Sequence, residues 1–103
     1  MSNIDGTWDC IVVAPVGKEP HELVLASGPD GSLTGTMTNL KNGIVMPLNN
    51  GKVDGDKVTW TMQLVKPFKL TLNVEIEVTG DEFTGHGGTA LLGKAPMTGT
   101  RRT

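Results

Sequence analysis

Several residue types that would point to a specific chemistry are scarce or absent in this sequence. There is no tyrosine, and the aromatic residues are limited to two tryptophans and two phenylalanines. The single cysteine, Cys10, excludes an intrachain disulfide and a cysteine-based zinc site. The two histidines, His21 and His86, lie far apart and lack the spacing of metal-binding motifs such as H-E-x-x-H. We therefore expect no metal ion and no cofactor.

Charge and hydropathy disfavour two further kinds of partner. Nine basic and eleven acidic residues give a net charge of −2, which makes binding to a nucleic acid unfavourable. No apolar run approaches the ~18 residues of a membrane span, and the first residues do not resemble a signal peptide. At 103 residues the chain has room for one domain, which we place at 1–103. A lone cysteine and no export signal favour the cytoplasm, without membrane contact.

Strand-forming residues and turn signals dominate what is present. Val, Ile and Thr contribute 27 residues, and such β-branched residues favour strands. Clusters of Gly, Asn, Asp and Pro recur at short intervals and reverse the chain, as at Gly28–Gly31 and Thr79–Asp81. Between them apolar and polar residues alternate with the period of a strand that has one buried face. No helix longer than one turn is expected, and the clearest strands are residues 6–13, 21–26, 33–38, 57–65, 68–78 and 94–101.

A four-residue pattern that occurs three times in the sequence bears on the architecture. An apolar residue, Thr, Gly and a polar residue follow one another at Leu33–Thr36, Phe83–His86 and Met97–Thr100. Glycine weakens a strand, so its recurrence indicates sharp bending or the close approach of two backbones. Short strands with one apolar face and interior glycines favour closure into an all-β, eight-stranded antiparallel up-and-down (meander) barrel. An open two-layer sandwich is the alternative.

Short motifs along most of the chain support the barrel by resemblance. Gly6-Thr7-Trp8, Gly31–Thr36, Pro47-Leu48 and Met97–Arg101 resemble the calycin superfamily, in particular its avidin-like (streptavidin-like) and compact lipocalin-like barrels. The layout is also similar to small barrel domains fused to some bacterial hydrolases. The resemblance implies a pocket at one end of the barrel, and closure of the other end by Trp8 and Arg101. The aromatic biotin pocket of avidins is not matched.

The expected inner face is almost entirely apolar. An eight-stranded barrel is just wide enough either to fill itself with side chains or to hold one small ligand. Four methionines have inward parity, and methionine either plugs gaps in a core or lines an adaptable apolar pocket. The leading hypothesis is binding of a hydrophobic small molecule inside the barrel. The residues expected to contact it are Met37, Met46, Trp60, Met62, Leu72, Val74 and Met97.

The two histidines are the candidates for any polar or catalytic role. His86 points outward if the alternation is regular, whereas a bulge at Gly85 would turn it inward. His21 has inward parity near a strand start, and the expected role there is a rim histidine bonded to a loop carbonyl. Either imidazole could serve a cofactor-free isomerase, lyase or cyclase acting on an apolar molecule, the alternative function. A third possibility is a filled barrel that acts only as an interaction module.

Two further expectations concern a buried thiol and an apolar outer surface. Cys10 has inward parity and should behave as an inert small hydrophobe. Ile11, Val13 and Val24 have outward parity although they are apolar. If adjacent strands bring them together, the resulting patch suits a partner surface, and we expect a homodimer through it.

Overall fold

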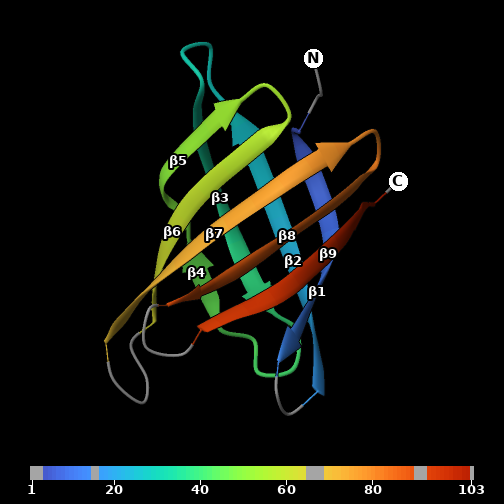
Figure 1. Ribbon diagram of the computed structural model, residues 1–103, viewed down its shortest axis with the longest axis vertical. Coiled ribbons are helices and arrows are strands. Elements are labelled where there is room, and N and C mark those ends of the chain that lie inside the picture. Colours follow the sequence, from blue (N-terminus) through green and yellow to red (C-terminus); the bar gives the residue numbers. More distant parts are fainter. Residues whose placement is uncertain (1–3, 15–16, 65–68, 90–92, 103) are drawn as a thin grey trace.

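A computed structural model describes residues 4–14, 17–64, 69–89 and 93–102 of the chain. Every regular element in these ranges is a β-strand (Figure 1). The expected all-β class is therefore confirmed. The strands are β1 (Gly6–Ala14), β2 (Gly17–Ser27), β3 (Ser32–Asn39), β4 (Val45–Pro47), β5 (Asn49–Asp54), β6 (Lys57–Leu64), β7 (Leu70–Thr79), β8 (Glu82–Thr89) and β9 (Gly93–Arg101).

The strands close into an antiparallel up-and-down barrel. β3 pairs with both β4 and β5, the other strands pair with their neighbours in sequence, and β1 also pairs with β9, which joins the two ends of the sheet. The nine labelled strands make an eight-stranded barrel, because β4 and β5 follow one another along the same edge of β3 and together occupy one strand position. Closure removes the unpaired edges that an open sheet would expose. The barrel prediction is thus confirmed over the two-layer alternative.

The break between β4 and β5 is a local irregularity at Leu48–Asn50. The register between β5 and β6 shifts between Asn49 and Lys52, and Asn50 has a φ of 53°. Leu48 keeps its place in the wall because its N–H donates to the Gly35 carbonyl at 3.0 Å. Such a bulge bends a strand and increases its twist, as closure of a small barrel requires.

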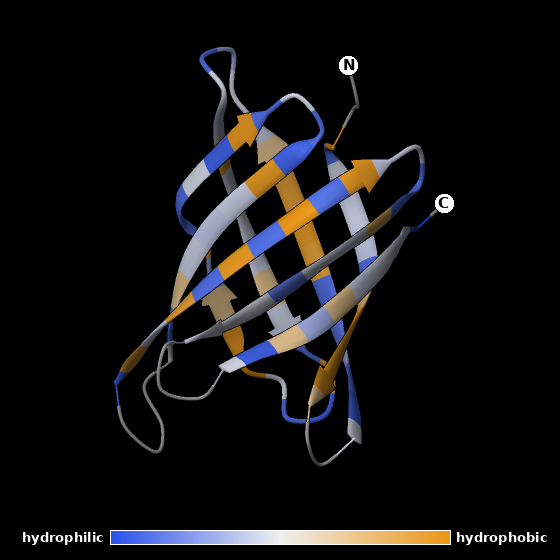
Figure 2. Ribbon diagram, viewed as in Figure 1, coloured by the Kyte–Doolittle hydropathy of each residue, from blue (hydrophilic) through white to orange (hydrophobic). Residues whose placement is uncertain are grey.

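The alternation in the sequence becomes the inside and outside of the barrel. Along β7, hydrophobic and hydrophilic residues alternate visibly (Figure 2), and Val74, Ile76 and Val78 are buried while Glu77 is exposed. The predicted segments match the observed strands, except that β2 begins earlier, at Gly17. Residues 65–68, where one predicted strand ended and another began, lie outside the described residues. The buried hydrophobic core comprises Ile4, Trp8, Cys10, Leu23, Leu25, Leu33, Met37, Leu48, Val58, Trp60, Met62, Val74, Ile76, Val78, Phe83 and Met97.

The repeated strand glycines mark close approaches. A Cβ at Gly35 would lie 1.9 Å from the Val24 carbonyl oxygen, and one at Gly85 would lie 2.1 Å from that of Glu75. At Gly99 the obstacle is a side chain, since a Cβ there would meet the Phe83 ring. The close backbone approach expected from the repeated pattern is therefore found at two of its three glycines. The third, Gly99, leaves space for the Phe83 ring.

One end of the barrel is closed by Trp8 and Arg101. The Arg101 guanidinium carbon lies 4.4 Å from the centroid of the fully buried Trp8 ring, and the Trp8 indole N–H donates to the Ile4 carbonyl at 3.1 Å. The guanidinium also donates to the Asp5 carbonyl at 2.6 Å and to the Asp81 carboxylate at 2.9 Å. Arg101 thereby ties the chain before β1 to the β7–β8 turn.

Replacing Arg101 with methionine should destabilise the barrel by about 2 kcal/mol, because the cation–π contact and a charge-assisted bond to a backbone carbonyl are lost together. Thermal unfolding followed by circular dichroism measures the change. Arg102→Met is the matched control, since Arg102 pairs with Asp9 and Glu22 only at the surface. Equal effects of the two substitutions would contradict a closing role for Arg101.

The outward apolar residues of β1 and β2 do not form the contiguous patch that was expected. Val24 pairs with Thr7, whereas Ile11 pairs with Pro20. Between these two pairs lies the pair Asp9–Glu22, and Arg102 forms ion pairs with both carboxylates. Two of the three residues, Val13 at 39% and Val24 at 36%, are exposed, but a charged cluster separates Val24 from the others. The homodimer itself stays a prediction.

Candidate functional site

The half of the barrel away from Trp8 contains a cavity of about 690 Å³. It opens at the end where β1 and β2, β3 and β4, and β8 and β9 are joined, which is the lower end in Figure 1. Apolar side chains form most of its wall, with a few polar groups toward the opening. The residues lining it are Val12, Val13, Ala14, Glu19, His21, Met37, Asn39, Met46, Met62, Leu72, Val74, Gly87, Gly88, Thr89, Gly93, Lys94, Ala95 and Met97.

Small residues on β8 and β9 create this space. Gly87 lies between Val74 of β7 and Ala95 of β9 across the sheet. Of these three neighbouring residues, glycine has no side chain and alanine has only a methyl group. A Cβ at Gly87 would meet the Met97 sulfur at 3.2 Å and a Val74 methyl at 3.3 Å. At the closed end the barrel instead holds large side chains, with the Trp8 and Phe83 rings 5.4 Å apart. The barrel is therefore packed at one end and hollow at the other.

Six of the seven residues expected to contact a ligand line the cavity: Met37, Met46, Met62, Leu72, Val74 and Met97. Trp60 is the exception. It is 2% exposed and pairs with Val74, but it is not part of the cavity wall. Its indole nitrogen is buried without a hydrogen-bond partner within the described part of the chain. Contact of these residues with a ligand remains a prediction.

His21 faces the interior, as its parity predicted. It is 5% exposed, lies between Cys10 of β1 and Asn39 of β3, and lines the cavity. Its Nδ1 atom is 3.1 Å from the Glu19 carbonyl oxygen. His21 therefore bonds a backbone carbonyl of its own strand and not the loop carbonyl that was predicted. The adjacent Glu22 points to the outer surface, where it binds Arg102.

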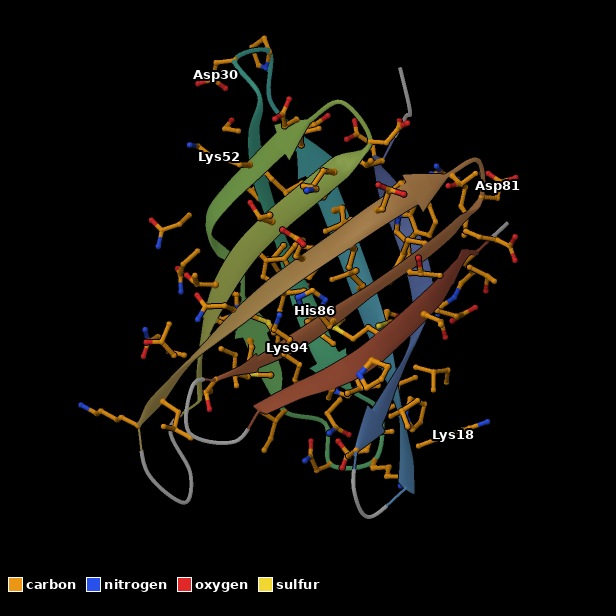
Figure 3. The ribbon with its side chains drawn as sticks, in the orientation of Figure 1. Lys18, Asp30, Lys52, Asp81, His86 and Lys94 are labelled. Atoms are coloured by element: carbon orange, nitrogen blue, oxygen red, sulfur yellow. The ribbon has the colours of Figure 1, made fainter. Side chains whose placement is uncertain are left out.

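His86 lies on the outer face of β8. The β7–β8 register is unbroken from Thr79–Glu82 to Asn73–Gly88, so there is no bulge at Gly85 to turn the ring inward. The imidazole is half-buried in a shallow outer groove with Thr59, Asn73 and Glu75, and Figure 3 places it midway along β8. The two candidate histidines are thus on opposite sides of the barrel wall.

Exposed apolar side chains lie in the β3–β4 connection at the open end of the barrel, which the sequence reasoning missed. Leu40, Ile44 and Val45 in and beside the β3–β4 loop are 53%, 49% and 55% exposed. The loop is fixed by backbone bonds, with Asn39 N–H donating to the Ile44 carbonyl and Gly43 N–H to the Asn39 carbonyl. A signal was present, because apolar residues flank a turn sequence that would ordinarily be polar.

Basic residues share this end of the molecule. Lys18, Lys41, Lys69 and Lys94 are exposed there, and Lys94 also lines the cavity. The acidic residues Asp30 and Asp81 lie at the opposite end, and Lys52 lies toward it (Figure 3). The hydroxyl and backbone N–H of Ser27 hold the pKa of the Asp5 carboxyl below its usual range there. Glu19 and Lys94 both line the cavity, so a ligand entering it passes side chains of both charges.

The Cys10 thiol is enclosed by the core. It is 1% exposed, and burial raises its pKa from the ordinary 9.0 to about 12. We expect iodoacetamide at pH 8 to modify the folded protein at least ~100-fold more slowly than the denatured chain, because the thiolate is the nucleophile. Mass spectrometry over time measures both rates. Rapid modification of the folded protein would contradict the burial of Cys10.

The raised pKa also predicts a loss of stability at alkaline pH. Between pH 9.0 and about 12 the thiol of the unfolded chain ionises while that of the folded chain keeps its proton. The unfolded state then binds fewer protons, so the free energy of unfolding falls as pH rises through this window. Denaturant unfolding of wild type and Cys10→Ala isolates the effect, because the variant should lack this part of the fall.

No family model, curated protein or solved structure matches the chain. The described ranges contain no helix long and apolar enough to cross a membrane.

Proposed function

We propose that the protein binds a hydrophobic small molecule inside the barrel. The observation that carries the proposal is the cavity of about 690 Å³, walled mainly by Met, Val and Leu side chains. Pockets for small organic molecules span roughly 300–1,000 Å³ and are mostly apolar with a few polar groups. Met37, Met46, Met62 and Met97 all lie in the wall, and their flexible thioethers suit ligands of varied shape.

The contrast between the two ends supports binding over simple packing. Trp8 and Phe83 fill the closed end, whereas Gly87 and Ala95 leave the other end hollow. A barrel that served only as a scaffold would gain stability from filling this space, because cavities cost free energy. The empty half is therefore best explained by a ligand.

The architecture also supports a family assignment, which we propose together with the function. A closed eight-stranded barrel with Trp8 and Arg101 at one end suits a calycin-like protein of the avidin-like or compact lipocalin-like kind, similar to hydrolase-fused barrel domains. A single, buried cysteine is compatible with the reducing cytoplasm.

Titration with N-phenyl-1-naphthylamine, a neutral apolar dye, tests the proposal. Its emission should shift to the blue and saturate at one dye per chain. Leu72→Asn should weaken binding about tenfold, because it places an amide in the apolar wall. Thr71→Asn is the matched control, since the neighbouring residue is exposed on the outer face. Absence of saturable binding, or equal weakening by both substitutions, would refute binding inside the barrel.

A further inference from the structure

We propose that the cavity selects apolar ligands carrying a hydrogen-bond donor, a hydroxyl or an N–H, and that Nε2 of His21 accepts this hydrogen bond. The inference rests on the proposed function, because it defines the ligand chemistry of the same cavity. It depends on the tautomer of His21, on the position of its ring in the wall, and on the polar groups around it.

The hydrogen bond of His21 to its own strand fixes the tautomer. Nδ1 lies 3.1 Å from the Glu19 carbonyl oxygen. A carbonyl oxygen has lone pairs but no proton, so Nδ1 must be the donor. A neutral imidazole carries a single N–H, and Nε2 then presents a lone pair. Neutral His21 is consequently an acceptor toward anything in the cavity.

The second ring nitrogen is accessible from the cavity. Nδ1 faces the Glu19 carbonyl two residues away on β2, so Nε2, on the far side of the ring, points away from that carbonyl. Nε2 is not among the fully buried side-chain nitrogen and oxygen atoms that lack a partner, so part of its surface is accessible. The side chain lies inside the barrel and lines the cavity, and its remaining 5% of accessible surface therefore faces that space. Within the described residues the ring makes no other hydrogen bond.

The surroundings make His21 the decisive polar group. Among the described residues of the wall it is the one polar side chain that is also buried. Glu19, Asn39 and Lys94 are less enclosed, and the Asn39 side-chain oxygen already accepts the Lys41 N–H at 2.8 Å. Deeper in the barrel, the neighbouring Cys10 and the methionines of the cavity wall offer only weak hydrogen-bonding groups.

An isolated acceptor in an apolar wall discriminates between ligands. A donor on the ligand satisfies the buried lone pair, whereas a ligand whose polar atoms are all acceptors leaves it without a partner. Alcohols, phenols and N–H heterocycles with an apolar body fit this requirement. Ethers and esters of the same shape do not.

Two probes of nearly equal shape separate these classes. We expect isothermal titration calorimetry to show that 2-naphthol binds about fivefold to tenfold more tightly than 2-methoxynaphthalene, since the difference is one hydrogen bond. His21→Leu should reduce this ratio to about one, because it removes the acceptor. The matched control is His86→Leu, on the outer face, which should leave the ratio unchanged.

A spectroscopic measurement on the unaltered protein complements the variants. Long-range ¹H–¹⁵N correlation should show that His21 is protonated at Nδ1 and not at Nε2. The Nε2 resonance should then shift when 2-naphthol is added and not when 2-methoxynaphthalene is added. This result does not depend on the folding of any variant.

Each contrary outcome has a distinct meaning. Equal affinity of the two probes for wild type, or an unchanged ratio in His21→Leu, would overturn the role of His21 and leave the proposed function standing. Protonation at Nε2 would do the same. If neither probe binds although N-phenyl-1-naphthylamine does, the inference fails alone; if the dye also fails to bind, the proposed function fails with it.

Discussion

Replacing Gly85 with alanine is expected to destabilise the barrel by about 3–5 kcal/mol. A Cβ at this position would lie 2.1 Å from the Glu75 carbonyl oxygen and 2.7 Å from the Ile76 Cα. Both obstacles are backbone atoms of β7, which cannot rotate aside as a side chain can. The melting temperature should fall by at least ~12 °C in calorimetry or circular dichroism.

Gly80→Ala provides the control for this prediction. Gly80 lies in the β7–β8 turn with a φ of +62°, and a Cβ there would meet nothing within 4 Å. The expected cost is only about 1 kcal/mol, from the left-handed backbone conformation. A Gly85→Ala protein as stable as Gly80→Ala would show that β7 and β8 are not as close as the barrel requires.

Gly87→Leu is expected to abolish binding of N-phenyl-1-naphthylamine while the barrel remains folded. The side chain would project into the cavity between Val74 and Met97. The methionine side chain can move aside at low cost. The new leucine side chain therefore mainly fills cavity space that a ligand would otherwise occupy. We expect the dissociation constant to rise at least ~30-fold, corresponding to about 2 kcal/mol or more.

Thr84→Leu is the matched control, because Thr84 is exposed on the outer face of the same strand. It adds the same side chain without entering the cavity, and dye affinity should not change. A Gly87→Leu protein that is folded by circular dichroism and still binds the dye with wild-type affinity would place the dye outside the barrel.

The inside and outside of the barrel could be predicted from the sequence because strand parity depends only on local alternation. His21 inside, His86 outside and the four inward methionines all follow from a period of two. The parity held at Gly85 because no bulge interrupts β8. This local signal was sufficient for the fold class and for most of the cavity wall.

Relations between strands could not be predicted in this way. Parity places Ile11 and Val24 on the outer face, but only the register shows that Asp9 and Glu22 lie between them. Trp60 is likewise inward, yet whether it reaches the cavity depends on how strands β5 to β7 are staggered and on the bulge at Asn49–Lys52. Register depends on turn geometry and on the pattern of the partner strand as well as on the strand itself, so it cannot be read from one strand alone.

Whether the barrel contains a cavity depends on the combined volume of side chains that different strands bring together. The alternation along the sequence does not give this volume. Gly87 and Ala95 are unremarkable in sequence, but they become neighbours across β8 and β9 and leave little side-chain volume in this part of the cavity wall. The exposed Leu40 and Ile44 at the open end of the barrel were missed because the reasoning assigned no role to apolar residues in a turn.

Methionine methyl NMR tests the central claim of a hollow, ligand-accepting barrel most directly. In protein labelled with ¹³C at the methionine methyl groups, N-phenyl-1-naphthylamine should give intermolecular nuclear Overhauser effects to Met37, Met46, Met62 and Met97, which line the cavity from four different strands. Dye that binds without effects to any of these four methyl groups, or fails to bind, would contradict the account.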